Sequence, residues 1–389
     1  MPAQTTEVEL SPLPARTPAI EMQAAVLRAP GTPVAIETVQ LDQPRRGEVL
    51  VRVAAAGVCR SDVHLADGSL GNGRWPMVLG HEGAGVVEAV GSGVSSVAAG
   101  DHVVLALYGP CGECGACRTG RFVLCNGAAR VAAISGRMAD GSTRMRASSN
   151  NDAVFPMVGI GSLAELAVLR ADQVVKVDAN IPLDVICLAG CGVTTGLGAV
   201  FNVADVRAGE TVAVVGCGGV GLNVVQGARI AGATTIVAVD TNPRKLALAE
   251  ELGATHTVDP SASGVVDAVN RVVAGGVDAA FEVVGVPQLV AETFLATRPG
   301  GRCVMVGSPP AGEPIPIDGR ALFGERRLLG TTGGSNVPAR DIPRIASLYT
   351  DGRLDLDTLV SARRPLRDFA ESIAETERGE VARSVVVMA

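Results

Sequence analysis

Four cysteines stand close together in the first half of the chain, at Cys111, Cys114, Cys117 and Cys125, with the spacing C-x2-C-x2-C-x7-C. Four thiolates so spaced can surround one zinc ion tetrahedrally in a closed site. An iron–sulfur cluster is the alternative, but the ferredoxin run continues as C-x3-C-P, whereas Asn126 follows the fourth cysteine here. We therefore predict a structural zinc ion that organises a lobe over about residues 109–126.

Three further residues, Cys59, His81 and Cys191, have the side chains of an open zinc site. Two thiolates and one imidazole leave a fourth tetrahedral position for a water or a substrate oxygen. They lie far apart in the sequence, and each alone is more often an ordinary buried residue. What favours a metal site is the setting of each one, Cys59-Arg-Ser-Asp62, Gly-His81-Glu82 and Gly-Cys191-Gly.

A glycine-rich turn, Gly216-Cys217-Gly218-Gly219-Val220-Gly221, directly follows a short apolar run. The G-x-G-x-x-G pattern between a strand and a helix permits a tight turn, the approach of a pyrophosphate and close packing of the helix. Asp240 follows about twenty residues later, at the end of the next apolar run. A carboxylate there accepts hydrogen bonds from ribose hydroxyls and repels a 2′-phosphate, so we predict NAD rather than NADP.

The elements that must position these residues fall into two groups. Before about residue 190, short alternating runs such as 48–53 predict a mostly β domain with one wet face per strand. After it, short apolar runs at 212–215, 236–239, 279–284 and 303–306 are separated by helix-like stretches such as 243–252. Buried parallel strands have this pattern, so the sequence predicts an α/β fold whose second domain is doubly wound.

Composition narrows the class of protein. Apolar residues make up 47% of the 389, charged residues 19%, and the net charge is −7. This suits a large buried core and disfavours binding to nucleic acid. Residues 1–21 lack the apolar segment of a signal peptide. The uncharged stretch 185–204 is long enough for a membrane span but rich in glycine. We therefore expect residues 1–21 to form a flexible tail and residues 185–204 to form a buried segment between the domains. We also expect no membrane partner and a cytoplasmic location.

Together these residues resemble those of zinc-containing medium-chain alcohol dehydrogenases, and in particular the NAD-dependent, animal-type and class III-like branch. The resemblance runs from about residue 22 to the C-terminus and rests on the order of the two cysteine groups, Gly80-His81-Glu82-Gly83, the glycine turn and Asp240. It implies a flexible tail over 1–21, a GroES-like, mostly β catalytic domain over 22–193 and 335–389, and an inserted Rossmann NAD-binding domain over 194–334.

The resemblance also implies a role for individual residues. Cys59, His81 and Cys191 would bind a catalytic zinc ion, with Glu82 as an occasional ligand and Asp62 orienting the His81 ring. Ser61 and His64 match the positions of a proton relay. The remaining matched positions face the cofactor: Arg60 and Arg383 at the pyrophosphate, Thr195 and Val220 at the nicotinamide, and Lys245 at the adenosine ribose.

The activity implied is an oxidoreductase that interconverts an alcohol and an aldehyde or ketone by hydride transfer to or from NAD. Two zinc ions per chain, a small-molecule substrate and a homodimer are expected, with a homotetramer as the alternative. A thiol-dependent formaldehyde dehydrogenase and a zinc- and NAD-binding regulatory protein without turnover are the competing functions. A nucleic-acid-binding ribbon built on the cysteine lobe is disfavoured by the net charge of −7.

Overall fold

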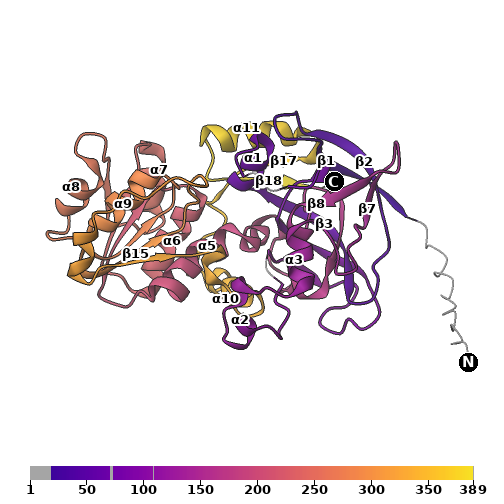
Figure 1. Cartoon of the computed structure of the whole chain (residues 1–389), viewed down its shortest axis with the longest axis horizontal. Coiled ribbons are helices and arrows are strands. Elements are labelled where there is room, and N and C mark those ends of the chain that lie inside the picture. Colours follow the sequence, from indigo (N-terminus) through magenta and orange to yellow (C-terminus); the bar gives the residue numbers. More distant parts are fainter. Residues whose placement is uncertain (1–18, 71–72, 108, 389) are drawn as a thin grey trace, which may run out of the picture.

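The computed structural model describes residues 19–70, 73–107 and 109–388. It has two lobes, one built around mixed sheets and the other around a parallel sheet, joined by helices α5 and α10 (Figure 1). The expected tail over 1–21 lies outside the described residues as far as residue 18, and strand β1 begins at Ile20.

The first lobe contains a small closed barrel and a larger sheet, both mainly antiparallel. In the barrel the strand order is β1 (Ile20–Leu27), β2 (Ala35–Leu41), β7 (Met145–Ala147), β8 (Ala153–Pro156) and β4 (Met77–Val78). In the sheet the order is β10 (Val174–Lys176), β6 (His102–Leu105), β5 (Glu82–Val90), β3 (Glu48–Val58), β18 (Arg383–Val387) and β17 (Val360–Pro365), with β9 (Leu166–Arg170) paired to β3.

The second lobe is a six-stranded sheet in which every strand pair is parallel. This confirms the doubly wound α/β prediction. The four predicted apolar runs fall on the four inner strands, and two of them, 279–284 and 303–306, extend slightly past the end of the strand. The strand order is β13 (His256–Val258), β12 (Thr235–Val239), β11 (Thr211–Val215), β14 (Val277–Glu282), β15 (Thr297–Met305) and β16 (Arg327–Gly330).

Helices cover both lobes and occupy the region between them (Figure 1). Around the parallel sheet lie α6 (Gly219–Ala231), α7 (Pro243–Glu251), α8 (Gly264–Asn270) and α9 (Pro287–Leu295). The first lobe carries α1 (Arg60–Asp67), α2 (Gly115–Arg118), α3 (Ala128–Ile134), α4 (Leu183–Ile186) and α11 (Phe369–Arg378). Between the lobes lie α5 (Gly192–Gly198) and α10 (Pro338–Thr350).

The uncharged stretch 185–204 forms a broken helical path through α4, the turn η4 (Cys187–Gly190), α5 and the π-helical segment η5 (Ala199–Ala204), most of it buried. Among the described residues, no single helix has the length and apolar character to cross a membrane. The two halves of this path meet that test only together, across a bend of 55°.

The C-terminal segment returns to the first lobe. Strand β18 pairs antiparallel with β3, so that Ser384 lies opposite Val58. Because Cys59 follows Val58 directly, this pairing places the start of β18 beside one of the predicted metal ligands. Residues more than 300 positions apart in the sequence therefore meet at one end of a single sheet.

Candidate metal and dinucleotide site

The four clustered cysteines converge in the lobe around α2. One ligand atom from each of Cys111, Cys114, Cys117 and Cys125 lies within 4.8 Å of all the others, and the Sγ atoms of Cys111 and Cys117 are 3.9 Å apart. Two sulfurs bound tetrahedrally to one zinc ion at about 2.3 Å would be about 3.8 Å apart. The sulfur positions therefore fit a zinc ion.

Backbone N–H groups lower the pKa of two of these thiols, Cys111 and Cys114, whereas burial raises the pKa of Cys117 to about 12. Backbone N–H groups of Cys117 and Asn126 point at the Cys114 sulfur and lower the pKa of that thiol to about 6. A thiol with a lowered pKa is more readily present as the thiolate that metals require. Local spacing alone suffices for this arrangement, since all four side chains lie in one short stretch of the chain around α2.

A second group of possible ligands brings together three distant parts of the chain. Ligand atoms of Cys59, His81, Glu82 and Cys191 lie within 4.8 Å of one another, and all but Cys191 are buried. Cys59 is the N-cap of α1, His81 and Glu82 stand at the start of β5, and Cys191 is the N-cap of α5. The structure thus juxtaposes the residues that the sequence proposed for the open zinc site.

Asp62 holds two of these ligand segments in place. Its fully buried carboxylate accepts hydrogen bonds from the backbone N–H of Cys59 at 2.9 Å and of Gly80 at 3.0 Å. Its Oδ1 also lies 3.7 Å from Nδ1 of His81. One side chain therefore positions the loop before α1, the turn before β5 and the imidazole ring.

The proximity of these side chains shifts their pKa values strongly. A hydrogen bond from the Cys191 thiol outweighs burial and lowers the pKa of the Cys59 thiol well below its usual range. Although burial opposes it, the Asp62 carboxylate raises the pKa of His81 well above its ordinary value, so zinc binding would displace the proton that the ring then carries. Among the described residues, the buried His81 Nδ1 and Glu82 Oε2 have no hydrogen-bond partner. Thiolate sulfur and imidazole nitrogen are donors that zinc prefers, so this set of side chains fits a zinc ion.

Glu82 links the possible ligands to the start of α5 and to Arg383. Its Oε1 accepts a hydrogen bond from Gly192 N–H at 3.0 Å and lies 3.6 Å from Nη2 of Arg383. Burial raises the pKa of Glu82 to about 7 despite the nearby guanidinium. Gly57 allows this fit, because a Cβ at that position would clash with Glu82 Oε2.

The two predicted relay residues lie on the helix that begins at Cys59. Ser61 Oγ is 3.9 Å from the Cys59 sulfur, and both Ser61 and His64 are partly exposed. Positions three apart on a helix share a face. Ser61 therefore stands beside the possible ligands, with His64 one turn further along the same face.

The glycine turn joins β11 to the N-terminus of α6. Gly216 has φ +97°, and a Cβ on Gly221 would clash with the Gly216 carbonyl oxygen, whereas the space beside Gly218 is open. Asp240 accepts hydrogen bonds from Cys217 N–H at 2.8 Å and Asn242 N–H at 2.9 Å. This carboxylate therefore braces the turn as well as standing at the end of β12.

The other predicted cofactor residues are distributed around this turn. The Arg383 side chain packs against Gly192 and Gly219 and so lies between α5 and the glycine turn. Thr195 is partly exposed on α5. Lys245 lines a cavity of about 530 Å³ together with Asn242 and residues 378–382. Arg60 is exposed and donates hydrogen bonds to the carbonyls of Thr376 and Glu377 at the end of α11, directly before the residues that line this cavity.

Sequence reasoning missed several residues that shape the site. Gly57 was not singled out, because one glycine among 48 carries no signal until Glu82 is placed against it. Asn202, Arg340 and Asp341, which contact one another beside α5, were missed for the same reason. Alternation of polar and apolar residues does not reveal such contacts.

Two family models match the two lobes. The model for the alcohol dehydrogenase GroES-like domain matches residues 45–179, and the model for zinc-binding dehydrogenase matches residues 219–350. The fold and the site thus define a zinc-type dehydrogenase. The chain belongs to the zinc-containing medium-chain alcohol dehydrogenase family.

Individual relatives cover almost the whole chain. An NDMA-dependent alcohol dehydrogenase of Amycolatopsis methanolica is 40% identical, covering 95% of this chain and 99% of that protein. An S-(hydroxymethyl)glutathione dehydrogenase of Paracoccus denitrificans is 37% identical, with 94% and 99% covered. These relatives confirm the expected class, a zinc-dependent oxidoreductase of alcohols.

Solved structures agree with this assignment. An alcohol dehydrogenase zinc-binding domain protein from Burkholderia ambifaria superposes with a TM-score of 0.91 at 39% identity, covering 95% of this chain and all of that one. Benzyl alcohol dehydrogenase from Acinetobacter calcoaceticus gives a TM-score of 0.89 at 31% identity, with the same coverage. The expected two-part fold is therefore confirmed.

Proposed function

We propose that this protein oxidises an alcohol to an aldehyde or ketone, or catalyses the reverse reduction, with NAD as the hydride carrier and zinc as the electrophile. The observation that carries the proposal is the placement of α5. Its first residues contact the Cys59, His81, Glu82 and Cys191 group, and its side packs against the glycine turn. A metal-held alcohol and a nicotinamide ring would meet along this helix.

In this proposal the role of the protein side chains is to bind the zinc ions and to orient the substrate. Cys59, His81 and Cys191 would hold the zinc ion and leave one position open, while Glu82 stays bonded to Gly192. When bound, zinc polarises the alcohol oxygen and NAD accepts the hydride. Cys111, Cys114, Cys117 and Cys125 would hold the second, structural ion.

Proton movement is assigned to α1. Ser61, next to the Cys59 sulfur, would accept the proton that the alcohol hydroxyl releases, and His64 would pass it on to solvent. An imidazole can both accept and release a proton, which suits it to this exchange. Both side chains are partly exposed, which gives the proton a way out.

The preference for NAD is assigned to Asp240. Its carboxylate stands at the end of β12 and braces the glycine turn. The same carboxylate would accept hydrogen bonds from the ribose hydroxyls, and its negative charge would repel a 2′-phosphate. We further propose that Gly216, Gly218, Gly219, Val220 and Gly221 approach the pyrophosphate and nicotinamide, with Arg383, Thr195, Lys245 and Arg60 as the remaining cofactor contacts. We also expect a cytoplasmic homodimer, to be tested by fractionation and light scattering.

The Paracoccus relative is named for a thiol adduct of formaldehyde, which keeps a thiol-dependent formaldehyde dehydrogenase as the second candidate. NAD reduction would be measured with aliphatic, allylic and benzylic alcohols, and with formaldehyde in the presence and absence of glutathione. Turnover with free alcohols supports the first proposal, and turnover only with formaldehyde plus thiol supports the second.

Two variants would show whether turnover uses this site. Cys191→Ser removes one of the possible ligands and should abolish turnover, while Cys303→Ser changes a buried cysteine on β15 and should retain it. A zinc-loaded protein that reduces NAD with none of these substrates would refute both functions and favour a regulatory protein.

A further inference from the structure

Helix α5 connects the metal group to the dinucleotide turn. At its start, Cys191 is the N-cap and Gly192 N–H bonds to Glu82. In its middle, Gly196 packs so closely on α6 that an added Cβ would lie 2.7 Å from the Val220 carbonyl oxygen. Any shift of α5 therefore changes the distance between the two halves of the site.

A tight turn presses on the other side of α5. This turn, η7 (Gly333–Ser335), follows the last strand of the parallel sheet. Gly334 has φ +65°, and a Cβ there would clash with the Thr194 carbonyl and lie 2.6 Å from the Thr195 carbonyl oxygen. From the helix side, a Cβ on Gly198 would clash with the Gly334 carbonyl. The two backbones thus touch directly, with no side chain between them.

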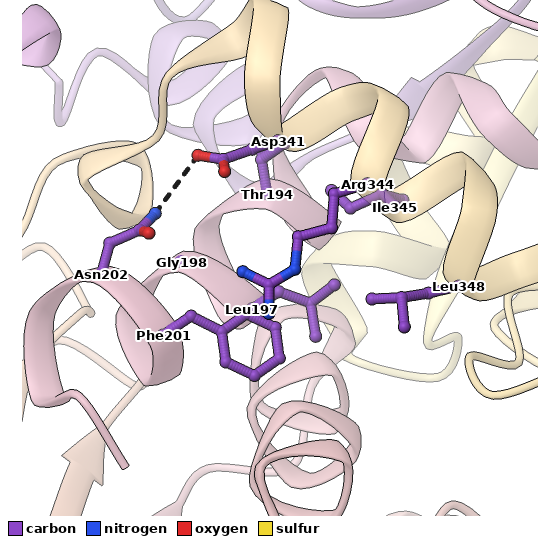
Figure 2. A pocket seen from close by; sticks show the side chains of 9 residues that line it. All are labelled: Thr194, Leu197, Gly198, Phe201, Asn202, Asp341, Arg344, Ile345 and Leu348. Atoms are coloured by element: carbon purple, nitrogen blue, oxygen red, sulfur yellow. Dashed lines mark hydrogen bonds between the residues drawn. The ribbon is translucent and has the colours of Figure 1, made fainter. Parts of the chain in front are cut away.

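Asn202 holds this turn in place from the π-helical segment η5. Its Nδ2 donates to the Gly334 carbonyl at 3.2 Å and to Asp341 Oδ2 at 3.3 Å, and its Oδ1 accepts from Arg340 Nη2 at 2.9 Å. Figure 2 shows the Asn202–Asp341 hydrogen bond spanning from η5 to α10. π-Helical turns are rare in proteins, and those that do occur are often found at functional sites.

Asp341 completes the set. Its Oδ2 accepts a hydrogen bond from the backbone N–H of Val337 at 2.8 Å. Val337 lies between the turn η7 and the start of α10. Arg340 Nε donates to its Oδ1 at 2.7 Å. The Asp341 side chain is almost completely buried, and these hydrogen bonds offset the cost of burying its carboxylate. We call Asn202, Arg340 and Asp341 the Asn202 clamp.

We propose that the Asn202 clamp is a positioning device for hydride transfer: it holds the Gly333–Ser335 turn against α5 and so fixes the spacing between the metal group and the dinucleotide turn. This inference rests on the proposed function. None of the three residues contacts the reacting atoms, and each acts through α5. Misplacement of reactants by about 1 Å can lower a rate about 100-fold, so a small shift would suffice.

Arg344 supplies a matched control. It lies on α10 within one turn of Asp341, and its guanidinium stacks over the Phe201 ring at 4.3 Å from the centroid (Figure 2). Its replacement disturbs packing between η5 and α10 without removing a hydrogen bond of the clamp. Arg344→Leu therefore reports on stability in this region, and Asn202→Leu reports on the clamp.

The experiment compares Asn202→Leu, Gly334→Ala and Arg344→Leu with the wild type in the full-length, zinc-loaded protein. Turnover would be measured with normal and carbinol-deuterated alcohol, NADH affinity by fluorescence titration, and protection of the 333–337 amides by hydrogen exchange. We expect the first two variants to lose about 10- to 100-fold in kcat, with a larger isotope effect, because hydride transfer becomes the slow step. Their 333–337 amides should also exchange faster.

The outcomes separate this inference from the proposed function. Unchanged isotope effects and kcat per folded molecule in both Asn202→Leu and Gly334→Ala would overturn it, as would equal effects in Arg344→Leu. A wild type without NAD-linked turnover refutes the proposed function instead. In that case the clamp is tested by hydrogen exchange of the 333–337 amides and by NADH affinity. If both are unchanged in Asn202→Leu, the inference about the clamp is overturned.

Discussion

Replacement of Asp62 by asparagine tests whether the metal group depends on a buried carboxylate. Each carboxylate oxygen of Asp62 accepts one backbone hydrogen bond: Oδ2 from Cys59 N–H at 2.9 Å and Oδ1 from Gly80 N–H at 3.0 Å. Asparagine has nearly the same shape but offers only one oxygen. Its amide NH₂ must then face a backbone N–H, so one ligand-bearing segment loses its anchor.

The size of the effect follows from these contacts. A buried donor without its partner costs about 1–3 kcal/mol. At about 1.4 kcal/mol per factor of ten, this corresponds to a roughly 5- to 150-fold loss. The loosened segment must be reordered when zinc binds, so the loss should appear in zinc affinity. Replacing residues that orient metal ligands typically costs 10- to 100-fold in affinity, about the same range.

The assay is competition with a chromogenic chelator, which reads the two zinc ions as separate phases. Asp62→Asn should weaken the phase assigned to Cys59, His81 and Cys191 and leave that of the four-cysteine lobe unchanged. Asp67→Asn is the matched control, since Asp67 lies on the same helix, is exposed and accepts from Ser69 N–H at 2.7 Å. Zinc affinity within twofold of the wild type in Asp62→Asn would refute the reasoning.

Three further predictions concern the other parts of the site. Ser61→Ala should lower kcat about 100-fold or more with unchanged zinc content; near-wild-type kcat would contradict the relay. Asp240→Asn should raise the ratio of kcat/KM for NADP to that for NAD, whereas Asp259→Asn, which alters an exposed aspartate that accepts from Ser261 N–H, should not; equal ratios would argue against the role of Asp240. Cys114→Ser should lose one zinc ion per chain and lower Tm, as measured by metal analysis and thermal unfolding; full zinc content would contradict the closed site.

Much of the fold is visible in the order of residues along the chain. The apolar runs at 212–215 and 236–239 coincide with β11 and β12, because strands buried on both faces must be apolar throughout. The four-cysteine lobe is equally local, since all its ligands lie within one short stretch. In both cases the signal and the structure occupy the same few residues.

The group of Cys59, His81 and Cys191 is different. Cys59, His81 and Cys191 are separated by long stretches, and only a family resemblance connected them before the sheets brought their segments together. Arg383 lies beside Glu82 because β18, which begins with Arg383, pairs with β3. Arg60 is tied to the C-terminal part of the chain as well, since it donates hydrogen bonds to the carbonyls of Thr376 and Glu377 at the end of α11.

The sequence by itself determined the closed cysteine site, the glycine turn with its acidic partner and the doubly wound second domain, because each depends on neighbours in the chain. Only the tertiary structure decided how Asp62 joins two ligand segments, how Glu82 fits against Gly57, and how Asn202 and Asp341 hold a turn against α5. These contacts depend on backbones that meet after long loops close, and loop closure leaves no periodic signal in the order of residues.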